Sequence, residues 1–240
     1  MLSESSLEES RSHAHHPPPG RARRTRRPGA RRPAPRGRAG PDLFEALRPL
    51  YDAESEPSLV EVPTMHFLMI DGHGDPSSGG EFREAMEALF PVAFTLKFAE
   101  RAKGVEYGLL PIEALWWTDE GGRFDVSRSR ETWRWTAMLA IPRVISWDDV
   151  DEARMGARHR HPFPAIDRIH LGSLTEGSAA QVLHRGPYST EGPTIAWLRR
   201  FIERSGLRPI GKHHEIYLSD PRRAAPDRVR TILRQPVHAL

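Results

Sequence analysis

The chain has 240 residues, no cysteine and a formal net charge of +3, and 28% of its residues are charged. The absence of cysteine excludes a disulfide framework, a zinc site built on thiolates and a cysteine nucleophile. No apolar run approaches the roughly 20 residues that cross a bilayer, and no apolar segment follows the N-terminal charges as in a secretory signal. We therefore expect a soluble, cytoplasmic protein with no membrane partner.

The positive charge is concentrated near the N-terminus. Residues 1–40 contain ten Arg, no Lys, three Glu and six Pro, with almost no large apolar residues. Such a segment buries too little apolar surface to offset its ordering entropy, so we expect a disordered tail. An Arg run of this kind binds nucleic acid weakly through counterion release, and the plainer alternative is a non-functional extension. The rest, 41–240, is the expected folded domain, with 29 acidic and 25 basic side chains.

The first half of this domain alternates between helix and strand patterns. Residues 42–51 have the apolar period of a short amphipathic helix, and 80–103 have that of a long helix despite Pro91. Ser146, followed by acidic residues, marks the start of a further helix that we expect to end near residue 158. Apolar, β-rich segments predict strands at 60–71, 107–118 and 131–142.

The second half shows the same kinds of element. A Gly- and Pro-rich break at 186–193 opens a helix, which Gly206 ends. Apolar segments on either side of this helix have the composition of strands. These strands are predicted at 168–174, 178–184, 211–219 and 229–237.

The two halves share one order of elements: strand, Gly/Pro-rich turn, long helix, strand with a central Glu, polar loop and return strand. Each half is too small to cover its own apolar faces, which predicts an α+β fold of two βαββ units of the SHS2 type, about 60–158 and 167–240, paired about a pseudo-two-fold. Glu113 and Glu215 are in register between the halves. We expect them to face each other across a central ligand cleft between antiparallel sheets. The alternative is that there is no repeat, because any two α+β halves look alike when only the order of their elements is compared.

The strand at 211–219 presents two different faces, because side chains alternate along a strand. His214 and Ile216 fall on the core side, and Glu215 and Tyr217 fall on the other side. A carboxylate and a phenol on one side of a sheet are costly to bury, which indicates that this side lines a cavity. The plainer alternative for Glu215 is a structural carboxylate paired with a nearby Lys or Arg.

Five runs carry a family resemblance. They are FLMIDGHGDP at 67–76, LWW at 115–117, WRWT at 133–136, GPYSTEGPT at 186–194 and the stretch 211–223. Together they resemble the GyrI-like small-molecule-binding superfamily, and more narrowly its stand-alone branch, which includes cyclopropanoid cyclopropyl hydrolases. The resemblance covers residue 41 to the end of the chain.

This resemblance implies a duplicated βαββ fold, an aromatic-lined cleft and a Glu in the ligand site. Some relatives bind planar, cationic drugs as regulators, and the hydrolase branch opens the strained cyclopropane of DNA-alkylating natural products. The expected partner is therefore a planar, largely apolar, aromatic or cationic small molecule, and cyclopropane-bearing compounds are the expected substrates of Glu-assisted water addition. The alternative is a module that binds or sequesters drugs, or senses an effector, without catalysis.

The residues suggest roles for this chemistry. Glu215 is the first candidate for the base that takes a proton from water, and Glu113 is the second. Tyr188 and Tyr217 are candidates to donate to the oxygen on which charge develops, although Tyr188 can also act only as a helix cap. Tryptophans on strands often belong to the core, but their ring faces also suit a planar ligand. The expected ligand contacts are Trp116, Trp117, Trp133, Trp135 and, more weakly, His66.

Other chemistry has little support in the sequence, and no cofactor or metal is expected. The pair Gly72 and Gly74 lacks the third Gly of a dinucleotide-binding turn. His213 and His214 are adjacent on a strand, so they point to opposite faces and cannot ligate one metal ion. The first 60 residues offer no helix-turn-helix, which disfavours direct transcriptional control. Inhibition of a topoisomerase by protein contact stays open, as does the oligomeric state.

Overall fold

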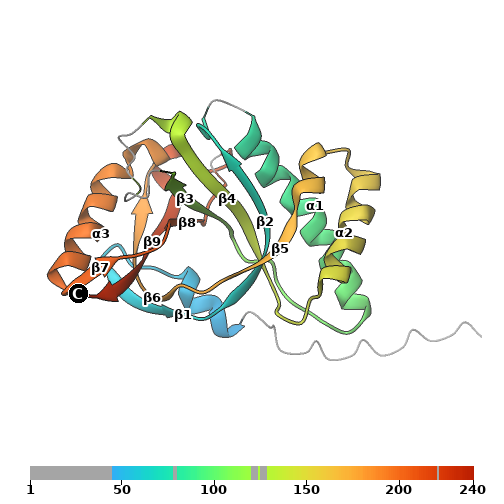
Figure 1. Cartoon of the computed structure of the whole chain (residues 1–240), viewed down its shortest axis with the longest axis horizontal. Coiled ribbons are helices and arrows are strands. Elements are labelled where there is room, and N and C mark those ends of the chain that lie inside the picture. The colour runs from blue at the N-terminus through green and yellow to red at the C-terminus, as the bar shows by residue number, and fades with distance from the viewer. Residues whose placement is uncertain (1–44, 78–79, 120–123, 125–128, 221) are drawn as a thin grey trace, which may run out of the picture. The chain divides into compact units, whose positions relative to one another are not determined.

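The computed structural model describes residues 45–77, 80–119, 124, 129–220 and 222–240 (Figure 1). The tail expected at 1–40 lies outside these residues, as do the first three residues of the helix expected at 42–51. Within the described ranges, no helix combines the length and the apolarity needed to span a membrane.

The described residues form an α+β fold. The helices are α1 (Glu81–Ala102), α2 (Trp147–Arg160) and α3 (Gly192–Arg204), and the 3₁₀ turns are η1 (Glu45–Tyr51), η2 (Arg130–Thr132), η3 (Pro164–Arg168), η4 (Tyr188–Thr190) and η5 (Pro226–Arg228). The strands are β1 (Ser58–Val62), β2 (Met65–His73), β3 (Ile112–Thr118), β4 (Trp133–Ile141), β5 (His170–Leu174), β6 (Gly177–Arg185), β7 (Leu207–Pro209), β8 (His213–Tyr217) and β9 (Arg230–Ala239).

The strands form an open antiparallel sheet in the order β1-β6-β9-β8-β3-β4-β2-β5, and β7 pairs with β9. This order is symmetric about the central β8–β3 pair, because β8, β9 and β6 follow one another on one side as β3, β4 and β2 do on the other. Each edge strand pairs with the half of the sheet to which it is not adjacent in sequence. Strand β1, which directly precedes β2 in the chain, pairs with β6, and β5, which directly precedes β6, pairs with β2. This arrangement supports the pairing of two βαββ units, and the duplication itself stays a prediction.

Each half of the sheet has its own helical cover. Helix α3 contacts β6 and β7, whereas α1 contacts β2 and β4 and packs against α2, so the helices lie beside the two ends of the sheet (Figure 1). Helix α2 begins as predicted: the Ser146 side chain accepts from the Asp149 N–H, and the Asp149 side chain accepts from the Ser146 N–H. This capping box satisfies two backbone donors that the first turn of a helix leaves without partners.

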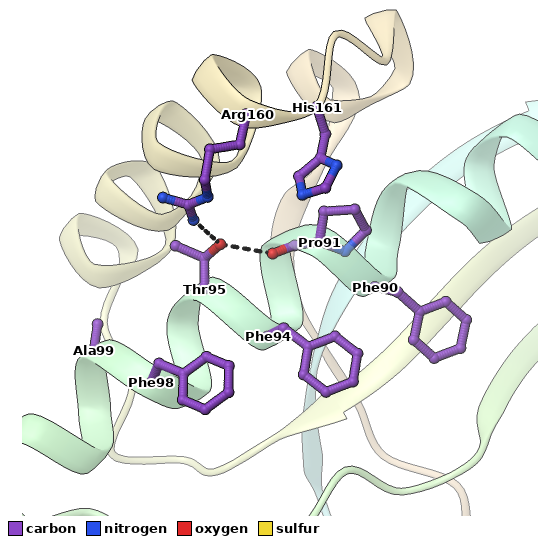
Figure 2. A pocket seen from close by; sticks show the side chains of 8 residues that line it. All are labelled: Phe90, Pro91, Phe94, Thr95, Phe98, Ala99, Arg160 and His161. Carbon is purple, nitrogen blue, oxygen red and sulfur yellow. Dashed lines mark hydrogen bonds between the residues drawn. The ribbon is translucent and has the colours of Figure 1, made fainter.

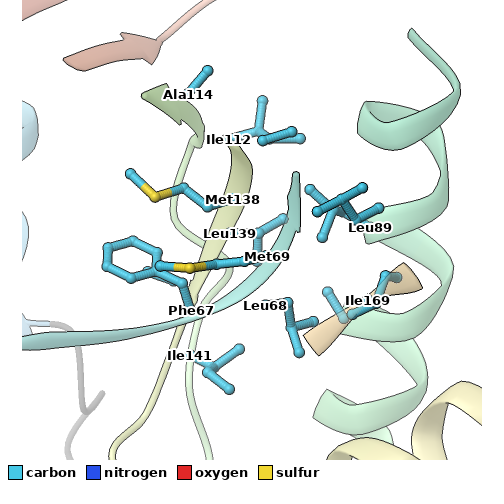
Figure 3. Close-up of a cluster of buried hydrophobic side chains, with 14 of the residues drawn as sticks. Phe67, Leu68, Met69, Leu89, Ile112, Ala114, Met138, Leu139, Ile141 and Ile169 are labelled. Carbon is cyan, nitrogen blue, oxygen red and sulfur yellow. The ribbon is translucent and has the colours of Figure 1, made fainter. Parts of the chain in front are cut away.

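The main core lies on both faces of β2, β3 and β4. Leu68 of β2 pairs with Leu139 of β4, which pairs with Ile112 of β3, so these side chains share the sheet face toward Leu89 of α1 (Figure 3). Phe67 lies on the opposite face. Burial of such side chains is the main stabilising term of a fold of this size.

Glycine at position 72 makes room for a buried indole. Gly72 lies opposite Trp135 in the β2–β4 ladder, and a Cβ at position 72 would lie 2.2 Å from two ring carbons of Trp135. The indole therefore lies across the backbone of β2, where it is fully buried. The same contact holds Trp135 in the core.

Most expected elements agree with the structure to within about two residues, the short strand β7 was not expected, and three elements differ more. The strand expected at 60–71 is two strands, which are separated at Pro63 because proline lacks the N–H that a ladder needs. Strand β1 pairs with β6, whereas β2 pairs with β4 and β5. The strand expected at 107–118 begins only at Ile112, after Pro111. The described part of the 42–51 segment is a 3₁₀ helix that contains Pro49.

Candidate functional site

A cleft of 880 Å³ lies over the centre of the sheet. Its sides come from the first half of α1 and from the turn that precedes α3, and its floor includes residues of β3 and β8. The cleft thus draws on both halves of the chain at the junction where the symmetric strand order reverses. The aromatic residues that line it are Phe82, Phe90, Trp116, Trp133, Tyr188 and Tyr217.

Only one of the two predicted carboxylates lies in the cleft. Residues directly opposite each other on antiparallel strands point to the same face. Glu215 pairs with Ala114 and lines the cleft, whereas Glu113 pairs with Ile216 and points to the opposite face. The prediction that Glu113 and Glu215 face each other across one cleft is therefore wrong, because β3 and β8 are direct neighbours in one sheet.

Glu215 is held from two sides. The Tyr217 hydroxyl donates to Glu215 Oε2 at 2.8 Å, and Trp116 Nε1 donates to the Tyr217 oxygen at 3.3 Å. His213 Nε2 lies 3.5 Å from Glu215 Oε1. Because the Tyr217 proton is engaged by Glu215, Tyr217 orients this carboxylate in the present geometry instead of donating to a ligand. Burial, followed by the charge of Glu215, raises the pKa of Tyr217 and keeps it protonated.

Glu191 is a second cleft carboxylate that the sequence reasoning missed. It lies directly before α3, is only 4% exposed and lines the cleft, and its Oε1 has no hydrogen-bond partner among the described residues. Burial and then the charge of Glu215 raise the pKa of Glu191 well above its ordinary value. The signal available in the sequence is an acidic residue inside the run at 186–194, a run that indicates a helix-opening turn and carries part of the family resemblance, with no role predicted for Glu191 itself.

Tyr188, a predicted site residue, lies at the side of the cleft. Its ring meets that of Tyr217 edge to face, with centroids 5.6 Å apart, and it is 42% exposed. Burial, together with the charges of Glu215 and Glu191, raises the pKa of Tyr188, so the phenol keeps a proton that it can donate.

A buried histidine supports the turn that carries Tyr188. His184 Nδ1 lies 2.9 Å from Thr194 Oγ1, and His184 Nε2 lies 3.3 Å from Thr190 Oγ1. The neighbouring Gly186 has a φ of 133°, which other residues rarely adopt. These contacts fix the path of the chain between β6 and α3 and thereby the positions of its cleft side chains.

Of the four tryptophans predicted to contact the ligand, two line the cleft and two do not. Trp116 and Trp133 line the cleft with their rings edge to face at 5.6 Å. Trp135 does not line it, because its ring lies in the core beside Phe82, at 5.1 Å between centroids. Trp117 points to the opposite face, where Lys212 Nζ lies 3.3 Å from its ring centroid. Because side chains alternate along a strand, the neighbours Trp116 and Trp117 point to opposite faces of the sheet.

His66 is also outside the cleft. It lies on β2, pairs with Ile141 of β4 and is partly buried, and its Nδ1 has no hydrogen-bond partner among the described residues. The cleft is lined by other residues, among them residues of α1, β3, β4, β8 and the turn before α3. A ligand in the cleft would therefore not contact His66.

The face opposite the cleft holds a buried chain of polar groups. Tyr51 donates to Glu113 Oε1 at 2.6 Å, and Glu113 Oε2 lies 2.8 Å from His214 Nε2. His214 Nδ1 lies 3.0 Å from Glu176, whose other oxygen accepts from Arg234 at 3.2 Å. Each carboxylate thus has a cationic partner, which is what burial of such groups requires. No group of three or more His, Asp or Glu among the described residues is arranged to hold a metal ion.

His214 is the centre of this polar chain. Burial would lower its pKa, but the charge of Glu176 and the hydrogen bonds to Glu113 and Glu176 outweigh burial and raise the pKa to about 9. For Glu176, burial acts to raise the pKa, and His214 and Arg234 lower it to about 2. Glu113 therefore contributes to a structural ion-pair network, and its predicted catalytic role has no contact with the cleft to support it.

A cavity with aromatic walls and a few converging polar groups, at the junction of two halves, defines a small-molecule-binding domain. Residues 148–237 match the family of the GyrI-like small molecule binding domain. The solved structure of an uncharacterized conserved protein from Listeria innocua is 37% identical, with a TM-score of 0.74, and the alignment covers 82% of this chain and 99% of that one. The chain belongs to the GyrI-like family.

Two further solved structures from Listeria innocua are similar over the same length. One is a hydrolase that is 34% identical, with a TM-score of 0.71, and the alignment covers 82% of this chain and 99% of the other. The second is a hydrolase encoded by lin2189, 35% identical with a TM-score of 0.73, and the alignment covers 82% and 98%. No match to a curated protein was found.

Proposed function

We propose that the protein binds planar, largely apolar small molecules in the aromatic cleft and hydrolyses cyclopropane-bearing electrophiles by adding water. The observation that carries this proposal is Glu191, a buried carboxyl with a raised pKa and an oxygen without a hydrogen-bond partner among the described residues, in a cleft that also holds Glu215. Two similar proteins are described as hydrolases, which agrees with a reaction in this cleft.

The shape and lining of the cleft suit a flat ligand. Its volume of 880 Å³ is that of a site for a drug-sized molecule. The Phe82 and Trp116 ring centroids are 5.0 Å apart, and Trp133 adds a third ring beside them. Aromatic faces of this kind bury a planar apolar molecule and exclude bulk water from its reactive carbon.

Water addition needs a base, and Glu191 meets the requirement better than Glu215. A general base works best when its pKa lies near the working pH, and the raised pKa of Glu191 moves it in that direction. The buried Oε1 of Glu191 has no hydrogen-bond partner among the described residues and can accept a proton from a water that enters beside it, whereas Glu215 accepts from Tyr217 through Oε2 and lies 3.5 Å from His213 through Oε1. Glu215 then acts by holding Tyr217 and by raising the pKa of Glu191.

The reaction balances as a simple addition. A water oxygen bonds to the cyclopropane methylene, one carbon–carbon bond of the ring breaks, and its electrons move to the carbonyl oxygen conjugated with the ring. Glu191 takes one proton from the water, and the Tyr188 hydroxyl donates a hydrogen bond to the oxygen on which charge develops. That oxygen takes a proton from solvent, and the proton on Glu191 passes to solvent. The product contains the atoms of the substrate and one water.

A binding module without catalysis is the second candidate, and the arrangement of Glu215 favours it. A carboxylate at the floor of an aromatic cleft is a good partner for a planar cation, because the ring faces and the negative charge both attract it. Such a ligand would be retained unchanged. The two candidates use the same residues for binding and differ only in whether product forms.

The test is to incubate the purified protein with a cyclopropane-containing alkylator of the duocarmycin type and to follow product by mass spectrometry. We expect one water to be added, with at least about a hundredfold loss of rate in Glu191→Gln. The matched control is Glu152→Gln, which changes an exposed carboxylate on α2. Tight binding without product would support the module instead, and absence of binding would overturn both candidates.

A further inference from the structure

A second hollow lies along the outer side of α1 and has a volume of 710 Å³ (Figure 2). Three phenylalanines, four residues apart, form a row along this side of the helix, and we call them the Phe stripe: Phe90, Phe94 and Phe98. The end of α2 contributes Arg160, whose Nη2 donates to Thr95 Oγ1 at 2.7 Å. Figure 2 shows the three rings on the side of α1 away from this hydrogen bond.

The Phe stripe is exposed, although aromatic side chains of this size are usually buried. The exposed fractions of Phe90, Phe94 and Phe98 are 36%, 46% and 62%, and the rings of Phe94 and Phe98 stack with centroids 6.5 Å apart. The core uses other positions of α1, such as Leu89 and Leu96. A contiguous exposed row of aromatic rings marks an interaction surface.

The charges on α1 are divided between its two ends. The part before the Phe stripe carries Glu81, Arg83, Glu84 and Glu87, for a net charge of −2. The part from Lys97 onward, with the residue that follows the helix, carries Lys97, Glu100, Arg101 and Lys103, for a net charge of +2. The helix therefore presents an acidic end, an aromatic middle and a basic end.

We propose that the Phe stripe is the contact between two copies of this chain, with their α1 helices antiparallel about a two-fold axis at Phe94. Glu87 and Arg101 are each seven residues from Phe94, so the operation places Glu87 of one copy beside Arg101 of the other. The same operation places Phe90 of one copy against Phe98 of the other. A two-fold interface must be self-complementary, and the sequence of this face meets that requirement in both its rings and its charges.

The charged residues already have partners within the chain, which limits the strength of the contact. Arg101 lies 3.2 Å from Glu106, and Glu87 lies 3.4 Å from Arg222; the two arginines are exposed and the two glutamates are partly buried. Three partly exposed rings also supply less than the roughly 1,200 Å² that a stable interface buries. The dimer is therefore weak and reversible, and it forms at high protein concentration. Phe90 lines both the cleft and the Phe stripe, but the dimer does not require the activity proposed for the cleft.

Sedimentation velocity of the full chain over a range of concentrations tests the contact. We expect a monomer–dimer equilibrium, which Phe94→Glu weakens at least about tenfold because it places like charges together on the axis. Met155→Glu is the matched control, since Met155 is 67% exposed on α2 outside the Phe stripe. A wild-type protein that stays monomeric at about 0.5 mM, or a Phe94→Glu protein that dimerises as well as wild type, overturns the proposal.

Two further variants identify the orientation. The chain has no cysteine, so Phe94→Cys introduces a single thiol, which should form a disulfide between two copies under mild oxidation, whereas Met155→Cys should not. Glu87→Arg and Arg101→Glu should each weaken the dimer, and the double variant should restore it. If the double variant is weaker than either single one, the antiparallel arrangement is wrong. A protein that self-associates only with added vesicles would point to a lipid surface and would likewise reject the dimer.

Discussion

Glu113 and Glu215 lie on neighbouring strands and point to opposite faces of one sheet, since Glu113 pairs with Ile216 and Glu215 pairs with Ala114. On one side Glu215 lines an aromatic cleft, and on the other Glu113 belongs to a buried chain of ion pairs through His214. Each of these two strands thus carries cleft-lining side chains and structural side chains at alternate positions. Variants one residue apart should therefore have different effects.

Trp116 and Trp117 give the most direct comparison of the two faces. Because only Trp116 lines the cleft, Trp116→Leu should weaken binding of a planar aromatic dye at least about tenfold, the cost of losing one ring contact. Trp117→Leu removes the contact with Lys212 on the other face and should change dye affinity less than about twofold. Fluorescence titration of both proteins, after their thermal unfolding is compared, measures this. Equal losses would mean that the ligand lies elsewhere.

The pKa of Glu191 should depend on Glu215. Burial and the charge of Glu215 both raise it, so Glu215→Gln should lower the pKa of Glu191 toward its ordinary value while burial keeps it elevated. Carbon NMR titration of the Glu191 carboxyl reads this shift even in a protein without turnover. In the active protein, hydrolysis should fall as the pH drops through the pKa of Glu191, because the base must be ionised. An unchanged titration in Glu215→Gln would show that the two carboxyls do not interact.

Glu113→Gln should destabilise the fold without direct contact with a ligand. The amide would place a donor or a neutral acceptor against the His214 ring in a site that water does not reach, and loss of one member of a buried ion pair costs about 3 kcal/mol. Tyr51→Phe removes only the hydroxyl bonded to Glu113 and should cost about 1 kcal/mol. Urea unfolding measures both values. A larger loss of stability in Tyr51→Phe than in Glu113→Gln would mean that the Tyr51 hydroxyl, and not the ion pair, is the main stabilising group.

Stability should fall as the pH rises above neutrality. The pKa of His214 is about 9 in the folded protein against 6.5 ordinarily, so its contribution is fully present below pH 6.5 and is lost as the pH approaches 9. The groups that face it are Glu113 and Glu176, with Tyr51 and Arg234 behind them. This shift corresponds to roughly 3 kcal/mol in the free energy of unfolding. Urea unfolding between pH 6 and pH 9.5 checks it, and a flat profile over this range would contradict the imidazolium assignment.

Two glycines offer a matched test of packing. Gly72→Ala places a methyl group 2.2 Å from the Trp135 ring, which has no space to move within the core, so it should cost about 3 kcal/mol or prevent folding. Gly80→Ala adds the same group where nothing lies within 4 Å, and its effect should stay within about 0.5 kcal/mol. Thermal unfolding of the two variants measures the difference. Similar stabilities would mean that β2 can shift away from Trp135.

The sequence by itself determined the α+β class, most strands and helices, the cap at Ser146 and the alternation that separates His214 from Glu215. These depend on residues close together in the chain, where periodicity and capping chemistry act directly. Only the tertiary structure decided that β3 and β8 are neighbours in one sheet, because strand order and register depend on contacts between distant segments. For that reason Glu113 lies on the face opposite the cleft. The packing of distant segments likewise decided that Trp135 lies in the core beside Phe82 and that Glu191 lines the cleft.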